Sequence, residues 1–194
     1  KMLWWVATLF MIGASLFALG CVMALREVAT DFATQAVFFL GSIFFTTAAY
    51  CELRLTTLAN PVDHASALSQ FIGTLLFNVN TFDGFFDLDW IASDSLVWTP
   101  NIFGSIMFLI SAALVMLDIC KRWWAWNFRS LIWWNAVINY AGCVAFMISA
   151  ILSFVVPAPL SGSYETMATI FTLIGALCFL VGAYMMWPEM SQKD

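Results

Sequence analysis

The chain has 194 residues, of which 63% are hydrophobic and only 10% are charged. An ordinary soluble domain carries about 25% charged residues. Together with a mean hydropathy of +0.91, this composition excludes a typical water-soluble fold and predicts an integral membrane protein surrounded by lipid. The formal net charge of −5 excludes a basic surface of the kind that binds nucleic acid.

Six apolar segments are long enough to cross a bilayer, since about 20 apolar residues cover its hydrocarbon core. In chain order they comprise residues 3–25, 32–51, 61–82, 100–119, 131–156 and 165–187. Asn60-Pro61 and Thr99-Pro100 each place a capping side chain before a proline, which is typical of a helix start. The sequence therefore predicts an all-α fold: residues 1–194 form a single transmembrane domain, a bundle of six helices.

One pattern recurs in every predicted span: a glycine, a phenylalanine four residues later, and a small or short polar residue seven residues later. These positions share one face of a helix with 3.6 residues per turn. Small residues let helices approach closely in lipid, so the glycines are predicted to lie at helix contacts. They are Gly13, Gly41, Gly73, Gly104, Gly142 and Gly175. Taken in chain order, the spans form three hairpin repeats.

The basic residues predict the orientation, because Lys and Arg are enriched on the cytoplasmic side of membrane proteins. Six spans place both termini on one side. If that side is cytoplasmic, it holds Lys1, Arg54, Lys121, Arg122, Arg129 and Lys193, and the other side holds only Arg26. We therefore expect a multi-pass protein with both termini in the cytoplasm and the acidic loop 83–99 outside. The tryptophans near the span ends, such as Trp98, Trp126 and Trp133, are interpreted as interfacial anchors.

The loop after the third span is acidic and contains no Lys, Arg or His between Asp83 and Asp94. Carboxylate oxygens are the ligands that hard cations such as Ca²⁺ prefer. Two interpretations remain open: a solvated acidic loop, or a weak divalent-cation site formed by Asp83, Asp87 and Asp89.

Two pairs of asparagines lie within the spans. Asn78 and Asn80 are near the outer end of the third span, and Asn135 and Asn139 are one turn apart near the inner end of the fifth. Polar groups at membrane depth usually face the bundle interior. They could form interhelical hydrogen bonds, worth about 0.6 kcal/mol each, or line a polar route. The ionisable residues, such as Glu52 and Asp118, fall at span ends, which disfavours a proton-coupled pump.

Two segments, PNIFGSIMFLISAALVMLDI (100–119) and WWNAVINYAGCVAFMISAILSFVVP (133–157), resemble a group of uncharacterised polytopic membrane proteins built from the YrhK-like hairpin domain. The mark of that domain is a pair of spans with a Gly-Ser-x-x-Phe core. Gly41-Ser42 with Phe45 and Gly104-Ser105 with Phe108 match it, whereas Gly73-Thr74, Gly142-Cys143 and Gly175-Ala176 depart at the second position. The family has no established activity, so the resemblance implies architecture only.

The chain contains no hydrolase, metalloprotease, nucleotide-binding or dinucleotide-binding motif, and we expect neither an enzyme nor a bound cofactor. The first interpretation is a non-catalytic accessory or scaffold subunit, whose partners are lipids and either another membrane protein or further copies of itself. The second is a small channel or transporter with a route lined by Asn78, Asn80, Asn135 and Asn139. The third is a metal-dependent enzyme acting on lipids through Asp83, Asp87 and Asp89.

Overall fold

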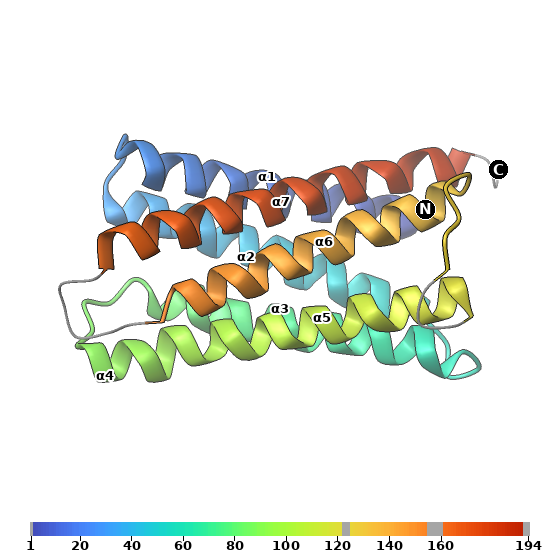
Figure 1. The fold of residues 1–194 in the computed structure, drawn as a ribbon, viewed down its shortest axis with the longest axis horizontal. Helices are drawn as coiled ribbons and strands as arrows, with labels where there is room; N and C mark the ends of the chain where they lie inside the picture. The colour runs from blue at the N-terminus through green and yellow to red at the C-terminus, as the bar shows by residue number, and fades with distance from the viewer. Residues whose placement is uncertain (1, 122–124, 155–160, 192–194) are drawn as a thin grey trace.

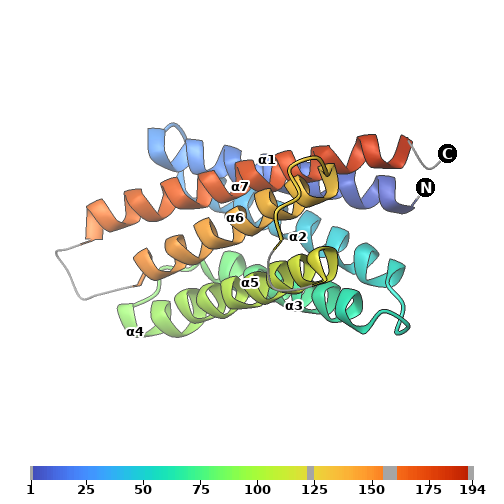
Figure 2. The same ribbon diagram turned by 45° about the vertical axis from the view of Figure 1, so that its right-hand side comes forward.

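The computed structural model describes residues 2–121, 125–154 and 161–191. Its elements are α1 (Met2–Arg26), α2 (Asp31–Leu55), α3 (Pro61–Asp83), α4 (Trp90–Ser93), the π-helix η1 (Asp94–Trp98), α5 (Thr99–Cys120), α6 (Leu131–Leu152) and α7 (Ser161–Ser191). Within these residues there is no β-strand. The long helices lie side by side along the long axis of the molecule (Figures 1 and 2).

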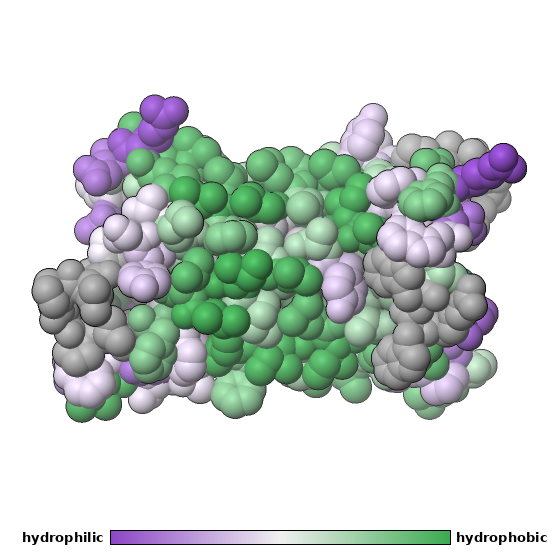
Figure 3. Space-filling view, in the orientation of Figure 1, coloured by the Kyte–Doolittle hydropathy of each residue, from purple (hydrophilic) through white to green (hydrophobic). Residues whose placement is uncertain are grey.

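Five helical segments are long and apolar enough to cross a membrane. They are Met2–Arg26, Asp31–Leu55, Trp90–Cys120, Leu131–Leu152 and Gly162–Trp187. The predicted span at 61–82 forms α3, which has 23 residues but is more polar than the others. Hydrophobic side chains form a broad band across the middle of the face in Figure 3, and hydrophilic ones gather toward the two ends. These features are consistent with a multi-pass membrane protein.

Two predicted span boundaries differ from the helices. The fifth span was expected to end at residue 156, whereas α6 ends at Leu152 and residues 155 and 156 lie outside the described part of the chain. The sixth was expected to cover 165–187, whereas α7 runs from Ser161 to Ser191 and passes through Pro188. A proline removes one N–H donor but leaves the following residues free to keep helical dihedral angles.

The predicted acidic loop 83–99 is helical over more than half of its length, because α4 and η1 lead directly into α5. Asp89 begins this segment by accepting a hydrogen bond from the Ala92 amide at 2.8 Å. The π-turn comes just before Pro100, whose missing N–H interrupts the regular helical hydrogen bonds. Thr99 donates its hydroxyl to the Asp94 carbonyl at 2.7 Å. The prediction that Thr99 caps a helix start is therefore wrong.

Side-chain caps begin three of the long helices. Thr30, Asn60 and Ser130 each accept a hydrogen bond from the backbone N–H three residues later. Such caps satisfy amides that have no partner within the helix. The predicted Asn60-Pro61 helix start is confirmed.

The six long helices form a closed ring. In order around the ring they are α1, α2, α3, α5, α6 and α7, and each contacts the next, with α7 returning to α1. The most extensive contacts are within the pairs α1–α2, α3–α5 and α6–α7. Members of each pair are neighbours in the sequence and run in opposite directions (Figure 1).

In each of these three pairs, one glycine from each helix lies at the contact. A Cβ atom added to Gly13 would lie 3.1 Å from the Gly41 carbonyl oxygen and 2.9 Å from the ring of Phe45. A Cβ added to Gly41 would lie 2.8 Å from the ring of Phe17. The other pairs repeat this exchange, with Phe108 against Gly73, Phe77 against Gly104, Phe179 against Gly142 and Phe146 against Gly175. All six glycines are buried at helix contacts.

Both chain ends lie at the same end of the bundle, and α4 lies at the other (Figures 1 and 2). Arg54 is in the last turn of α2, at the end of the bundle where the termini lie, and Arg26 is in the last turn of α1, at the α4 end. Lys1, Arg122 and Lys193, which also entered the prediction of orientation, lie outside the described residues.

Candidate functional site

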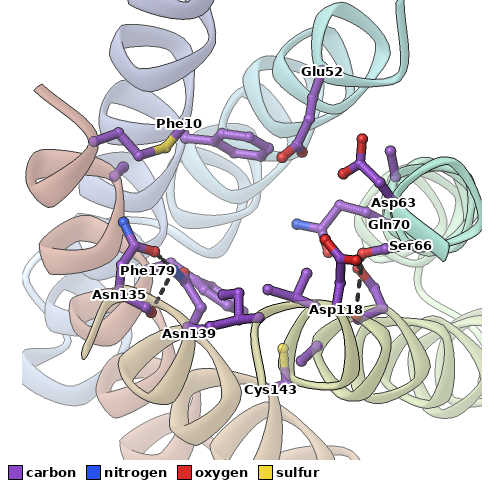
Figure 4. Close-up of a pocket in the computed structure, with 18 of the residues that line it drawn as sticks. Phe10, Glu52, Asp63, Ser66, Gln70, Asp118, Asn135, Asn139, Cys143 and Phe179 are labelled. Carbon is purple, nitrogen blue, oxygen red and sulfur yellow. Dashed lines mark hydrogen bonds between the residues drawn. The ribbon is translucent and has the colours of Figure 1, made fainter. Parts of the chain in front are cut away.

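A cavity of about 390 Å³ lies inside the ring at the end where the termini lie. Its wall includes the last turns of α2 and α5 and the first turns of α3 and α6, so the cavity reaches the end of the bundle. Its volume is within the ~300–1,000 Å³ range of small-molecule sites. Its polar and acidic side chains include Glu52, Asp63, Gln70, Asp118, Asn135 and Asn139 (Figure 4).

One wall of the cavity is acidic. Glu52 from α2 and Asp63 from α3 point toward one another in Figure 4, and Asp118 from α5 lies on the same side. Asp118 forms an ion pair of 2.9 Å with Lys121, whose side chain is 78% exposed. Neither Glu52 nor Asp63 has a side-chain hydrogen bond or an ion pair with any residue in the described part of the chain. The acidic wall is thus only partly neutralised and attracts positive charge.

The facing wall carries amides. The Asn139 side-chain nitrogen donates to the Asn135 side-chain oxygen at 2.6 Å, and the Asn135 nitrogen donates to the Gly182 carbonyl on α7 at 2.9 Å. A Cβ at Gly182 would overlap the Asn139 side chain, so the glycine leaves room for this amide. The pair therefore joins α6 to α7 by a hydrogen bond and also lines the cavity.

The other asparagine pair lies elsewhere. Asn80 donates to the Val97 carbonyl at 2.8 Å and so fixes η1 against α3. The side-chain oxygen of Asn78 is buried and has no hydrogen-bond partner among the described residues. Neither residue lines the cavity. The structure does not bring the four asparagines of the predicted route to one cavity.

A layer of six phenylalanines closes the cavity toward the middle of the bundle. Its members, one from each long helix, are the phenylalanines of the repeated pattern: Phe17, Phe45, Phe77, Phe108, Phe146 and Phe179. Neighbouring ring centroids lie 5.1 Å apart for Phe77 and Phe108 and 6.0 Å apart for Phe45 and Phe179. The void among the rings measures only about 10 Å³, and one water needs at least about 10–15 Å³. Phe45 and Phe179 also line the cavity and form part of its floor.

The acidic residues in segment 83–99 do not gather around a common point. In the described part of the chain, no group of three or more His, Cys, Asp or Glu side chains is placed to hold a metal ion. Asp89 instead accepts the Ala92 amide as a helix cap. Asp83, Asp87 and Asp89 are therefore not assembled as the predicted ligand set.

The sequence did not single out the acidic wall. It placed Glu52 and Asp118 at span ends, where charged residues are ordinarily solvated, and gave Asp63 no role. A usable signal was present, because the topology puts the end of the second span, the start of the third and the end of the fourth on one side of the membrane. The sequence could not show that these three turns face inward.

No family model, no curated protein and no solved structure matches this chain. The resemblance to YrhK-like hairpin proteins therefore stays a prediction about architecture. The cavity, its charges and the aromatic layer are the observations on which a functional proposal rests.

Proposed function

We propose that the chain is a six-span membrane protein that binds a small cation in the cavity and moves it across the membrane without covalent chemistry. The observation that carries this proposal is a partly acidic cavity that reaches one end of the bundle and is closed halfway by the phenylalanine layer. A carrier exposes its binding site to one side of the membrane at a time. A protein with only a scaffolding role needs no such cavity.

The outer surface of α3 supports the proposal that this helix also crosses the membrane, which brings the number of spans to six. Between residues 68 and 82 every exposed residue of this helix is apolar: Leu68, Ile72, Leu75, Val79 and Phe82. Its hydroxyl groups are turned inward, as in the hydrogen bonds between the Thr81 and Ser42 hydroxyls at 2.9 Å and between the Ser66 and Ser111 hydroxyls at 3.1 Å. The polarity that lowers the hydropathy of α3 is therefore directed at other helices, and lipid meets an apolar surface.

The exchanged glycine–phenylalanine contacts support three hairpins arranged around one axis. Because the hairpins insert in the same direction, they are parallel repeats, which occur in some transporter folds. The termini end carries Arg54, Lys121 and Arg129, whereas the other end carries Arg26, and this bias among the described residues favours cytoplasmic termini. In this orientation the cavity faces the cytoplasm and the acidic segment 83–99 faces the outside.

Uptake into proteoliposomes tests the proposal. We expect the purified chain to accelerate the uptake of rubidium or methylammonium ions, and we expect Asn139→Leu to lower that uptake at least tenfold, because it removes an amide from the cavity wall. Asn101→Leu is the matched control, since Asn101 makes a comparable hydrogen bond, to Ser153 at 3.2 Å, and does not line the cavity. The absence of uptake for both ions, or equal loss in the two variants, would contradict the proposal.

One observation supports the alternative that the chain is an accessory subunit. Phe86, Trp90 and Ile91 are at least half exposed at the α4 end of the bundle, a surface that suits contact with another protein in the interface. Purification in a mild detergent distinguishes the two proposals. A stoichiometric partner, together with no ion uptake by the chain alone, would favour the accessory role.

A further inference from the structure

We infer that the cavity takes an organic cation with an apolar body, such as an alkyl- or arylammonium ion. This inference rests on the proposed function, because it names the chemical class of the solute for the same cavity. It follows from the separation of the acidic groups, from the size of the cavity and from the difference between its two walls.

The acidic wall favours a ligand that is positively charged and donates hydrogen bonds. The half-buried Glu52 carboxylate points toward that of Asp63 across the cavity (Figure 4), and Asp118 adds a further acidic group on the same side. Like charges on one wall repel one another, and a cation among them relieves that repulsion. An ammonium group carries a positive charge and several N–H donors, so it can bind to two carboxylates at once.

A divalent metal ion fits this arrangement poorly. The carboxylates of Glu52, Asp63 and Asp118 do not form a group placed to hold a metal within the described part of the chain. Calcium and magnesium need several oxygen ligands within about 2.0–2.6 Å of one point. In addition, a cavity of about 390 Å³ has room for a molecule of several non-hydrogen atoms.

Besides the amides, the cavity is lined by aromatic and aliphatic side chains. Phe10, Phe45 and Phe179 line it, together with Ala183 and Met186. Aromatic faces attract ammonium groups and also bury apolar surface. A ligand with a cationic head and a short apolar body would thus contact both walls at the same time.

Calorimetric titration of the full-length chain in detergent tests this inference, with phenethylammonium as the probe. We expect saturable binding that weakens at least tenfold in Glu52→Gln and in Asp63→Asn, because each removes one of the two carboxylates without an ion-pair partner. Glu165→Gln is the matched control, since Glu165 is exposed on α7 and does not line the cavity; its affinity should equal that of the wild type. Phenylethanol, which has the same body without the charge, and Mg²⁺ should not bind.

A second measurement covers the case in which a charge variant does not fold. Ala67 lines the cavity, so in a variant without native cysteines a small thiol reagent that enters the cavity should react with Ala67→Cys. Phenethylammonium should slow that reaction at least fivefold, and phenylethanol should leave it unchanged. Protection by both compounds, or by neither, would overturn the inference.

The two proposals fail in different ways. If the wild type does not bind phenethylammonium, or binds phenylethanol equally well, the assigned ligand class is wrong even where rubidium uptake persists and depends on Asn139. Unchanged binding in both folded charge variants would likewise overturn the assignment. If phenethylammonium binds as expected but no ion is taken up by proteoliposomes, the ligand class stands and the transport proposal is wrong.

Discussion

At the scale of the residue, the glycines of the repeated pattern allow close helix contacts because they have no Cβ atom. A Cβ on Gly104 would lie 2.7 Å from the ring of Phe77 and 3.2 Å from the Gly73 carbonyl oxygen. The described glycines do not adopt positive φ angles, so the requirement for glycine comes from packing between helices and not from the backbone conformation. In lipid this close packing is the main source of association, since apolar burial against a neighbouring helix gains little over contact with lipid.

Substitution of two glycines separates the packing requirement from helix propensity. We expect Gly104→Ala to lower the free energy of unfolding by about 1–3 kcal/mol, because the added methyl group overpacks the contact with Phe77. Gly162→Ala should leave stability unchanged or raise it by up to about 1 kcal/mol, because a Cβ there would meet nothing within 4 Å. Thermal denaturation of both variants in one detergent provides the measurement, and similar destabilisation in both would contradict the packing role.

The tryptophans show the limit of sequence analysis at the scale of the residue. Trp133 is only 1% exposed, packs with Met116 and donates its indole N–H to the Ala125 carbonyl at 2.7 Å. Trp126, seven residues earlier, is 68% exposed. Both were predicted to anchor the protein at the membrane interface. For Trp133 this is wrong, because its ring is buried and its N–H is hydrogen-bonded, as a buried indole requires. The position of a residue near a span end does not distinguish a buried indole from an interfacial one.

At the scale of the element, α3 shows why average hydropathy differs from the hydropathy of the surface that lipid meets. The helix is long enough to span a bilayer, yet its mean hydropathy excludes it from the segments selected by composition. Its hydroxyl side chains are turned toward α2 and α5, where they form hydrogen bonds with Ser42 and Ser111. A polar face that is turned toward other helices lowers the mean hydropathy of a helix without exposing a polar group to lipid.

Labelling from the two sides of the membrane tests whether α3 crosses it. In a variant without native cysteines, we expect a membrane-impermeant maleimide to label Leu58→Cys from one side only and Asp87→Cys from the opposite side only. Leu58 is 81% exposed before α3, and Asp87 is exposed after it, so both positions are accessible to the reagent. Labelling of both cysteines from the same side would show that α3 does not span the membrane.

At the scale of the whole molecule, the closed arrangement of helices brings one phenylalanine from each long helix into the aromatic layer. The pairs α1–α2, α3–α5 and α6–α7 place their phenylalanines on partner glycines, and the six side chains then meet at the centre. Cross-contacts such as Phe17 with Phe146, at 6.1 Å between ring centroids, link different pairs. The layer therefore both packs the bundle and limits the depth of the cavity.

The placement of both chain ends at one end of the bundle predicts the topology of fusion proteins. A phosphatase that is active only outside the cytoplasm should be inactive when fused at either terminus, because an even number of spans returns the chain to its starting side. The same enzyme inserted after Asp87 should be active, since that segment lies at the other end of the molecule (Figure 1). Opposite activities at the two termini would contradict the six-span proposal.

The sequence by itself determined the features that depend on composition and local periodicity. The fraction of hydrophobic residues and the lengths of the apolar segments predicted helices suited to a membrane, and a period of 3.6 residues placed each glycine and its phenylalanine on one helix face. Tertiary structure alone decided which faces meet. Glu52, Asp63 and Asp118 share a cavity, whereas Asn80 and Asn139 do not. The rotation of each helix about its axis sets which side chains face inward, and it depends on contacts between residues far apart in the chain.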